Sequence, residues 1–350
     1  MHLQVTHETR YDYLPPVEVA QHMSHLQPLT TATQTLLSHT LQIAPEPAQQ
    51  TRTQDIYGNT RCFFSLQTAH SQLQVVARSR VATRAPAMPA STALWEPVRE
   101  RFRFAAGSGY DAAAEFVFAS PYVPRHADFA AYARPSFPAG APLLLATRDL
   151  MRRIHADFSY ESESTEVNTP ALQALAQRKG VCQDFAHIMI ACLRALGLPA
   201  RYVSGYLLTE PPPGVARLVG SDASHAWVSV YIPDFPDLPD FPADARWCDF
   251  DPTNNKCGFG APGEDYITLA IGRDFGDVSP LRGVIHGGAK HTLHVGVTVE
   301  PADGGAQGQS QTQGMGLGQS QSQSQQAQGQ GQSQWSQGSQ GSQWQTQSQG

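Results

Sequence analysis

The sequence predicts an α+β fold, with a small antiparallel β domain ahead of a core in which one helix packs on an antiparallel sheet. Three patterns support this class. Apolar and polar residues alternate with period two from Leu3 to about Thr83. A helical period follows at 142–158 and again at 182–196, and short strand-like runs continue to Asp251. Strands, helices and strands in this order are typical of α+β proteins.

The length of the chain limits the number of domains, and its net charge limits the kinds of partner that it can have. A chain of 350 residues allows roughly two domains, and a 41% share of hydrophobic residues is enough for each to bury a core. The net charge is -6, and no run of Lys or Arg occurs. This argues against nucleic acid or an anionic membrane as the main partner. Neither a basic, apolar leader nor a stretch of about 18 apolar residues is found, so a cytoplasmic protein is expected.

The cysteines indicate free thiols. Five are present, an odd number at irregular spacing, and no pair has Cys-x-x-Cys spacing. A chain of this size is not a disulfide scaffold, and Cys248 with Cys257 lacks a second close pair of soft ligands. We expect neither a metal ion nor another cofactor.

Residues 1–85 form the predicted N-terminal β domain. On its first strand, alternate residues from Leu3 to Tyr13 share one face. Tyr57-Gly58-Asn59-Thr60 reads as a hairpin turn, because Gly and Asn accept positive φ at little cost. Four further strands are expected, at 35–44, 51–57, 60–67 and 73–81. The domain carries no catalytic constellation, so we interpret it as a scaffold or a substrate-guiding surface.

Three further segments follow. Residues 86–140 are predicted to be a helical connector, with short helices at 94–104 and 126–133. The catalytic core is assigned to 141–302 and begins with a firm helix at 142–158. Residues 303–350 are nearly all Gln, Ser and Gly, so they cannot bury enough apolar surface to offset the entropy of ordering. We expect this tail to be disordered.

The helix at 182–196 carries a thiol in its first turn. Its apolar residues recur at helical spacing, and Gly197 and Pro199 end it. The positions are Phe185, Ile188, Met189, Cys192, Leu193 and Leu196. Cys182 precedes Phe185 by three residues on the same stripe, so its sulfur should point toward the core side. The positive end of the helix dipole favours a thiolate there.

Three strands are expected after this helix, at 200–208, 224–232 and 246–251, with the Pro- and Asp-rich segment 233–244 as a hairpin loop. If the last two pair antiparallel, the start of one lies beside the end of the other. His225 is then next to Asp251. Pro252 cannot donate to the ladder, so Asp251 should lie at the rim of the sheet.

A thiol, an imidazole and a carboxylate are what nucleophilic catalysis by cysteine requires. A free thiol has a pKa of about 8.5, so Cys182 needs His225 as base, and Asp251 would orient that base. Singly, each residue has an ordinary structural explanation: core packing for the cysteine and histidine, a turn for the aspartate. Three independent placements that converge on one point favour chemistry. His187, five residues after Cys182, should point elsewhere and be structural or a supporting group.

The oxyanion of such a reaction needs hydrogen-bond donors. The backbone N–H of Cys182 offers one. Tyr160 and Asn168 lie upstream as candidates for the second, although a purely structural role is the favoured reading for both.

The chain resembles the transglutaminase-like superfamily of papain-type cysteine enzymes. The matching stretches are Gly180-Val-Cys-Gln-Asp-Phe-Ala-His187, Leu196 to Tyr206, His225-Ala-Trp227 and Asp251-Pro-Thr253. The chain looks in particular like the bacterial subgroup with an N-terminal β domain, and residues 272–283 resemble that subgroup's C-terminal signature. The resemblance implies a papain-like, transglutaminase-core fold with Cys182 as nucleophile, His225 as base and Asp251 as orienting residue.

The expected function is a cysteine-dependent acyl transfer that opens a peptide or glutamine amide through a thioester. Hydrolysis by a protease or amidase is favoured, because water is the default acceptor. The alternatives are a protein-glutamine gamma-glutamyltransferase and a non-catalytic peptide-binding module on the same fold, since the superfamily includes members without catalysis. Self-cross-linking through the Gln-rich tail is disfavoured, because the chain has three lysines. A protein or peptide substrate is expected, and the oligomeric state is left open.

Overall fold

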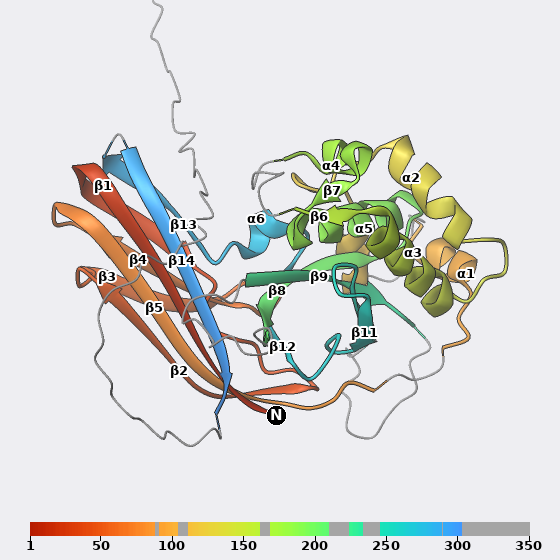
Figure 1. The fold of residues 1–350 in the computed structure, drawn as a ribbon, viewed down its shortest axis with the longest axis horizontal. Helices are drawn as coiled ribbons and strands as arrows, with labels where there is room; N and C mark the ends of the chain where they lie inside the picture. The colour runs from red at the N-terminus through yellow and green to blue at the C-terminus, as the bar shows by residue number, and fades with distance from the viewer. Residues whose placement is uncertain are drawn as a thin grey trace, which may run out of the picture.

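Two sheets organise the molecule. The computed structural model describes residues 1–87, 91–103, 111–161, 169–209, 224–233, 246–288 and 290–302. A curled antiparallel sheet built mainly from the N-terminal residues lies beside a core in which the helices gather on one side of a five-stranded sheet (Figure 1). This arrangement confirms the predicted α+β class. The hairpin loop and the tail that were predicted from the sequence lie outside the described residues, apart from Pro233.

The N-terminal sheet is organised around one long strand, β1 (His2–Ser24). Its first half pairs with β5 (His70–Thr83), and its second half pairs with β4 (Thr60–Leu66). The two outer strands are β2 (Gln34–Ala44), which pairs with β5, and β3 (Gln49–Gln54), which pairs with β4. The predicted strands of this domain are confirmed. The first is longer than expected, because it changes partners instead of ending.

The C-terminal strands return to the same sheet. β13 (Leu281–Gly287) pairs with the second half of β1, and β14 (Lys290–Pro301) pairs with the first half, so that Leu3 lies opposite Pro301. In Figure 1 these strands lie against β1. The sequence interpretation placed this segment within the core at 141–302. In the structure this segment instead belongs to the N-terminal sheet, because β13 and β14 both form hydrogen bonds with β1 at the start of the chain.

Helices begin where the connector was predicted. Helix α3 matches the firm helix predicted at 142–158, whereas α4 was not predicted. After α3, the short strand β6 (Ser159–Tyr160) pairs in parallel with β7 (Lys179–Gly180), directly before the thiol-bearing helix. The helical elements up to that point are α1 (Trp95–Arg101), the 3-10 turn η1 (Ala112–Val117), α2 (Ala127–Ala133), the 3-10 turn η2 (Arg134–Ser136), α3 (Leu143–Asp157) and α4 (Ala171–Gln177).

The core sheet has the order β11-β10-β9-β8-β12. Three of its strands were predicted and are confirmed: β8 (Ala200–Leu207), β9 (Ser224–Tyr231) and β10 (Trp247–Asp251). The outer strands, β11 (Lys256–Phe259) and β12 (Tyr266–Gly272), were not predicted. A single turn of helix, α6 (Phe275–Val278), follows β12. All pairings in this sheet are antiparallel.

Helix α5 (Cys182–Ala195) lies between this sheet and the other helices. It contacts β8 and β9 on one side and α2, α3 and α4 on the other. Ile188, Met189 and Leu193 are fully buried, and burial of each such side chain contributes about 1.5–3 kcal/mol. A helix packed on all sides is a rigid support for a side chain in its first turn.

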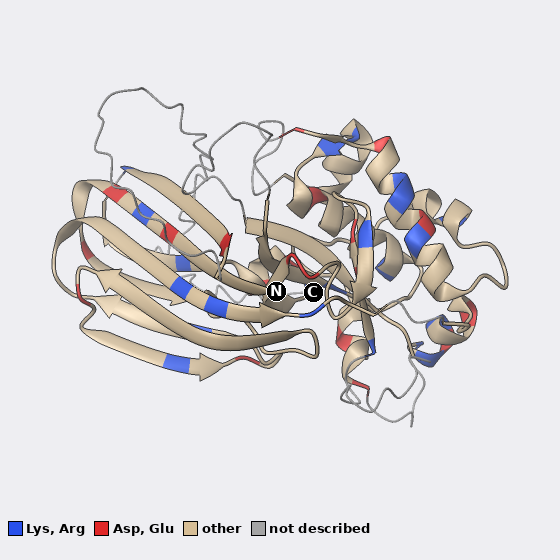
Figure 2. Cartoon of the chain, turned by 60° about the horizontal axis from the view of Figure 1, so that its bottom comes forward, with Lys and Arg blue, Asp and Glu red and all other residues tan. Residues whose placement is uncertain are grey.

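The two sheets share an apolar interface, formed by Leu3 and Val299 from one and Tyr206 and Leu269 from the other. Charged residues of both signs are spread over both parts of the molecule (Figure 2). Within the described ranges, no helix is long and apolar enough to span a bilayer.

Candidate active site

The first turn of α5 is fixed by its own sequence. The backbone N–H of the N-cap residue Val181 donates to Asp184 Oδ2 at 2.9 Å. Asp184, the third residue of the helix, therefore occupies the acidic position of a capping box. A Cβ at Gly180 would lie 2.6 Å from the same oxygen, so only glycine allows this approach. Cys182 is therefore held as the first helical residue, partly buried at the edge of the apolar core. Its thiol is at the positive end of the helix dipole.

The register of β9 and β10 brings an imidazole and a carboxylate together. Phe250 lies opposite Val228, so Asp251 extends the ladder next to Trp227, one diagonal step from His225. His225 Nε2 is 2.7 Å from Asp251 Oδ2. The antiparallel pairing expected from the sequence is thus observed, and Asp251 ends β10.

Asp251 is fully buried, and five donors satisfy its carboxylate. Oδ1 accepts from the backbone N–H groups of Thr253 (2.8 Å) and Asn254 (3.3 Å). Oδ2 accepts from His225, from Asn254 Nδ2 (2.7 Å) and from the Tyr266 hydroxyl (2.7 Å). Burial alone would raise the pKa of Asp251, but the charge of His225 and these hydrogen bonds outweigh it and lower the pKa. The carboxylate therefore stays ionised.

His225 is buried and cationic. Burial works to lower its pKa, but the charge and hydrogen bond of Asp251, together with the hydrogen bond and charge of Cys182, raise it to about 10. Because Nε2 is held by Asp251, Nδ1 is the ring nitrogen left for the thiol. The structure thus brings the three predicted residues together: His225 is hydrogen-bonded to Asp251, and Cys182 is close enough to raise the pKa of the same imidazole.

Aromatic rings shield this pair from water. The His225 ring centroid is 6.1 Å from that of Trp227 and 5.9 Å from that of Tyr266. Trp227 and Tyr266 meet edge to face at 5.4 Å. A low local dielectric strengthens the attraction between the imidazolium and the carboxylate.

Tyr160 lies close to the nucleophile. It belongs to β6, opposite Gly180, and is 52% exposed. Partial desolvation, then the charges of Cys182 and Asp184, raise the pKa of Tyr160 to about 12, so its phenol remains a donor. The other upstream candidate, Asn168, lies outside the described residues.

His187 is not part of this site. Its ring is stacked on Tyr122 at 5.5 Å and tilted against Tyr202 at 5.0 Å, and its Nε2 accepts a hydrogen bond from the backbone N–H of Phe275. Burial, with a smaller effect of Arg194, lowers the pKa of His187 to about 3. The imidazole is a neutral packing element, in agreement with its expected structural role.

A polar cluster at the other end of α5 was missed by the sequence reasoning. Arg194 is buried and donates to the carbonyl oxygens of Ala200, Phe118 and Arg273. Arg194 interrupts the apolar sequence of the helix end, and this was the available signal.

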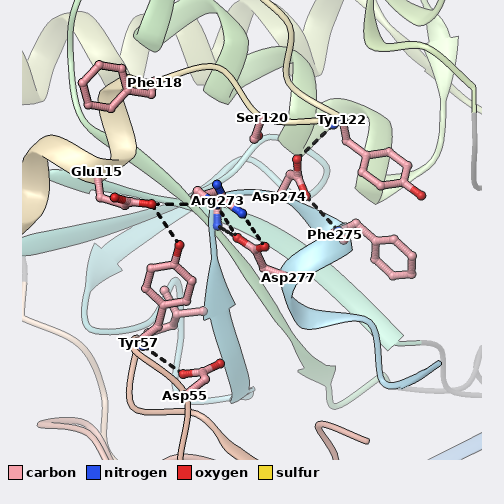
Figure 3. Close-up of polar contacts among 12 residues, drawn as sticks. Asp55, Tyr57, Glu115, Phe118, Ser120, Tyr122, Arg273, Asp274, Phe275 and Asp277 are labelled. Atoms are coloured by element: carbon pink, nitrogen blue, oxygen red, sulfur yellow. Dashed lines mark hydrogen bonds and ion pairs between the residues drawn. The ribbon is translucent and has the colours of Figure 1, made fainter. Parts of the chain in front are cut away.

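Around it, Figure 3 shows Arg273 between Asp277 and Glu115, with the Tyr57 hydroxyl donating to Glu115. Asp274 accepts from the backbone N–H of Tyr122 at 2.9 Å. These contacts tie the 272–283 segment to the C-terminal half of α5 and to the N-terminal sheet.

The part of the chain that the structure describes contains no group of three or more His, Cys, Asp or Glu side chains suited to a metal ion.

Known proteins share both parts of the chain. A family model described as "Transglutaminase-like superfamily" matches residues 130–252, and one described as "Bacterial transglutaminase-like N-terminal region" matches residues 3–82. An uncharacterized protein of Mycobacterium tuberculosis (strain ATCC 25618 / H37Rv) is 38% identical over 306 residues, covering 87% of this chain and 94% of its own length. A protein-glutamine gamma-glutamyltransferase of Pseudomonas aeruginosa is 31% identical over 133 residues, covering 33% of this chain and 18% of its own.

A crystal structure of a "Putative Cysteine Protease" from Cytophaga hutchinsonii has a TM-score of 0.61 at 22% identity, covering 87% of this chain and 92% of that one. This likeness extends over both sheets and confirms the papain-like, transglutaminase-core fold expected from the sequence. The residues that carried the resemblance, Cys182, His225 and Asp251, all fall within the core match. The chain belongs to the transglutaminase-like superfamily and carries that superfamily's bacterial N-terminal region.

Proposed function

We propose that the protein is a cysteine-dependent acyl-transfer enzyme that hydrolyses peptide or glutamine side-chain amides through a thioester. One observation carries the proposal: His225 interacts with Asp251 on one side and with Cys182 on the other. An imidazolium in that position stabilises a thiolate, which is the nucleophilic form of cysteine.

The reaction follows from these contacts. The Cys182 thiolate attacks the amide carbonyl carbon, and the oxyanion that forms accepts from the backbone N–H of Cys182, a donor without an intrahelical partner. His225 gives its proton to the leaving amine as the carbon–nitrogen bond breaks, which leaves a thioester. His225 then takes a proton from water, the water oxygen attacks the thioester, and the carbon–sulfur bond breaks. A carboxylic acid is released, and the thiolate and imidazolium are restored.

Asp251 keeps its negative charge throughout. It orients the ring of His225 and stabilises the imidazolium, and the five donors that it accepts oppose its protonation. Tyr160 is half exposed near Cys182, and its phenol would donate the second hydrogen bond to the oxyanion.

A second candidate is transfer of the acyl group to an amine. The relative named as a protein-glutamine gamma-glutamyltransferase matches a third of this chain, and both reactions pass through the same thioester. They differ only in whether water or an amine attacks it.

Labelling and cleavage test the proposal. Iodoacetamide at pH 7 should alkylate Cys182 well before Cys62 or Cys192, both of which are buried. A peptide library should be cleaved by the wild type and not by Cys182→Ala, and a labelled primary amine should not be incorporated. Amine incorporation without cleavage would support the transferase instead. Equally slow alkylation of all the thiols would support a non-catalytic binding module.

A further inference from the structure

We propose that Asn254 and Tyr266 are positioning residues, which hold the Asp251 carboxylate in register with His225 from two different strand ends. The inference rests on the proposed function and concerns how its site is kept aligned. Neither residue was assigned a role from the sequence.

One oxygen is the focus of the arrangement. Asp251 Oδ2 accepts from His225 Nε2, Asn254 Nδ2 and the Tyr266 hydroxyl, each at 2.7 Å. Three side-chain donors on one carboxylate oxygen fix its position in three directions. Asp251 is 0% exposed, so solvent does not replace a donor that is lost.

Asn254 approaches from the turn that ends β10. Its backbone N–H donates to Oδ1 and its side-chain amide donates to Oδ2, so the turn encloses the carboxylate. Asn254 Nδ2 is also 3.3 Å from His225 Nε2. Both nitrogens donate to the same oxygen, Asp251 Oδ2. The Asn254 amide therefore limits rotation of the His225 ring away from that oxygen.

Tyr266 approaches from the far side of the sheet. It begins β12, which is an edge strand, and is separated from β9 by β8. Gly205 of β8 makes the approach possible, because a Cβ there would clash with the Trp227 ring and with the backbone oxygen of Ile267. The Tyr266 ring then packs edge to face on Trp227. Its hydroxyl ends at Asp251, and burial, with the charge of Asp251, raises the pKa of Tyr266, so the phenol is a donor.

These donors favour the ionised form of Asp251 and so help to keep the proton on His225. An oxygen that already accepts from Asn254 and Tyr266 has less electron density to offer the His225 proton. The proton therefore stays on the imidazole, where it can be delivered to the leaving amine. Loss of either donor should raise the pKa of Asp251, because hydrogen bonds from both side chains lower it.

The test uses a readout that needs no substrate, the pH dependence of Cys182 alkylation by iodoacetamide in the full chain. Tyr266→Phe keeps the ring and removes only the hydroxyl. We expect alkylation at pH 7 to slow about tenfold, with the acid limb of the profile moved to higher pH. Asn254→Ala should act in the same direction, and Asn254→Asp should act more strongly because it places a second carboxylate beside Asp251. With a cleaved peptide, kcat should fall and KM should stay constant.

Tyr132→Phe is the matched control. The Tyr132 hydroxyl also donates to a carboxylate, that of Asp157 at 2.8 Å, but away from the site. Tyr132→Phe should leave the pH profile of Cys182 alkylation unchanged. Thermal melting of all the variants would show that they are folded. Profiles of Tyr266→Phe and Asn254→Ala that coincide with the wild type would overturn the inference and leave the proposed function standing. A wild-type Cys182 no more reactive than Cys62 would overturn both.

Discussion

Two buried histidines, His187 on the thiol-bearing helix α5 and His225 on the neighbouring strand β9, have opposite protonation states. Burial lowers the pKa of His187 to about 3, whereas the pKa of His225 is raised to about 10 against the same effect of burial. His187 has aromatic rings and a backbone N–H around it. His225 has Asp251 and Cys182. Burial alone favours a neutral imidazole, whereas a buried carboxylate that accepts hydrogen bonds from protein donors favours an imidazolium.

Carboxylates near His187 do not change this result, because their hydrogen-bonding capacity is used elsewhere. Asp274 accepts from the backbone N–H groups of Tyr122 and Gly276, and Asp277 pairs with Arg273. The cationic Arg194 further disfavours an imidazolium. The identity of the donors and acceptors around each ring therefore separates the two histidines.

Replacing each histidine in turn should give the largest effect. His225→Gln removes the cation beside Cys182, so alkylation at pH 7 should slow by a factor of about 30, because a thiol with a pKa of about 8.5 is only a few per cent thiolate at that pH. His187→Gln keeps an acceptor for the Phe275 N–H and should change the rate only slightly. Alkylation rates of the two variants, with thermal melting as the folding control, make the comparison. Equal losses of reactivity would mean that the two histidines do not differ in role.

Asp251→Asn should have the next largest effect. The amide keeps the shape of the side chain but removes the charge that raises the pKa of His225. The imidazolium loses a hydrogen bond to a charged group, so the alkylation rate at pH 7 should fall by about tenfold. The pKa of His225, followed by NMR, should fall toward or below 6.5. An unchanged imidazole titration would show that Asp251 does not stabilise the imidazolium.

Stability should depend on pH in opposite directions for the two rings. The pKa of His187 is lower in the folded than in the unfolded protein. The contribution of His187 to the free energy of unfolding is therefore complete above about pH 6.5 and is lost as the pH falls toward 3. The pKa of His225 is higher in the folded protein, so its contribution is complete below about pH 6.5 and is lost as the pH rises through about 10.

Urea unfolding at pH 5, 7 and 9 would measure these slopes, each at most about 1.4 kcal/mol per pH unit. His187→Gln should flatten the acid side of the stability profile, and His225→Gln the alkaline side. If both substitutions flattened the same side, the assignment of the two protonation states would be wrong.

The smallest expected effect lies at the exposed edge of the polar cluster. Glu115 is 4.0 Å from Arg273 Nε and accepts from the Tyr57 hydroxyl at 3.4 Å, with both Arg273 and Glu115 partly exposed. Glu115→Gln should reduce the free energy of unfolding by less than about 1 kcal/mol and leave Cys182 alkylation unchanged. A larger loss in urea unfolding would indicate that this edge helps to hold the cluster beside His187.

The sequence predicted the elements that have a local pattern. The apolar stripe of 182–196 gave α5, and the short β-branched runs gave β8, β9 and β10. The neighbouring positions of His225 and Asp251 followed from antiparallel pairing, and the structure has that pairing. Each of these inferences needed only residues close together in the chain or a short hairpin.

Contacts between distant residues were not predictable in this way. The residues of β14 alternate between buried and exposed positions, as in many strands, but this pattern does not identify β1 as the pairing partner. Tyr266 packs on Trp227, whose ring has room only because residue 205 is glycine, and this contact depends on the order of three strands. Asn254 directly follows the Asp251-Pro-Thr253 stretch, but the role of its amide becomes visible only when Asp251 and His225 are in contact.

The pH dependence of Cys182 alkylation tests the central claim most directly, that Cys182, His225 and Asp251 form a thiolate–imidazolium site. We expect Cys182 to react rapidly well below the pKa of about 8.5 that is typical of a free thiol, and His225→Gln to move the profile up to that value. A wild-type profile with a midpoint near 8.5, unchanged by His225→Gln, would contradict it.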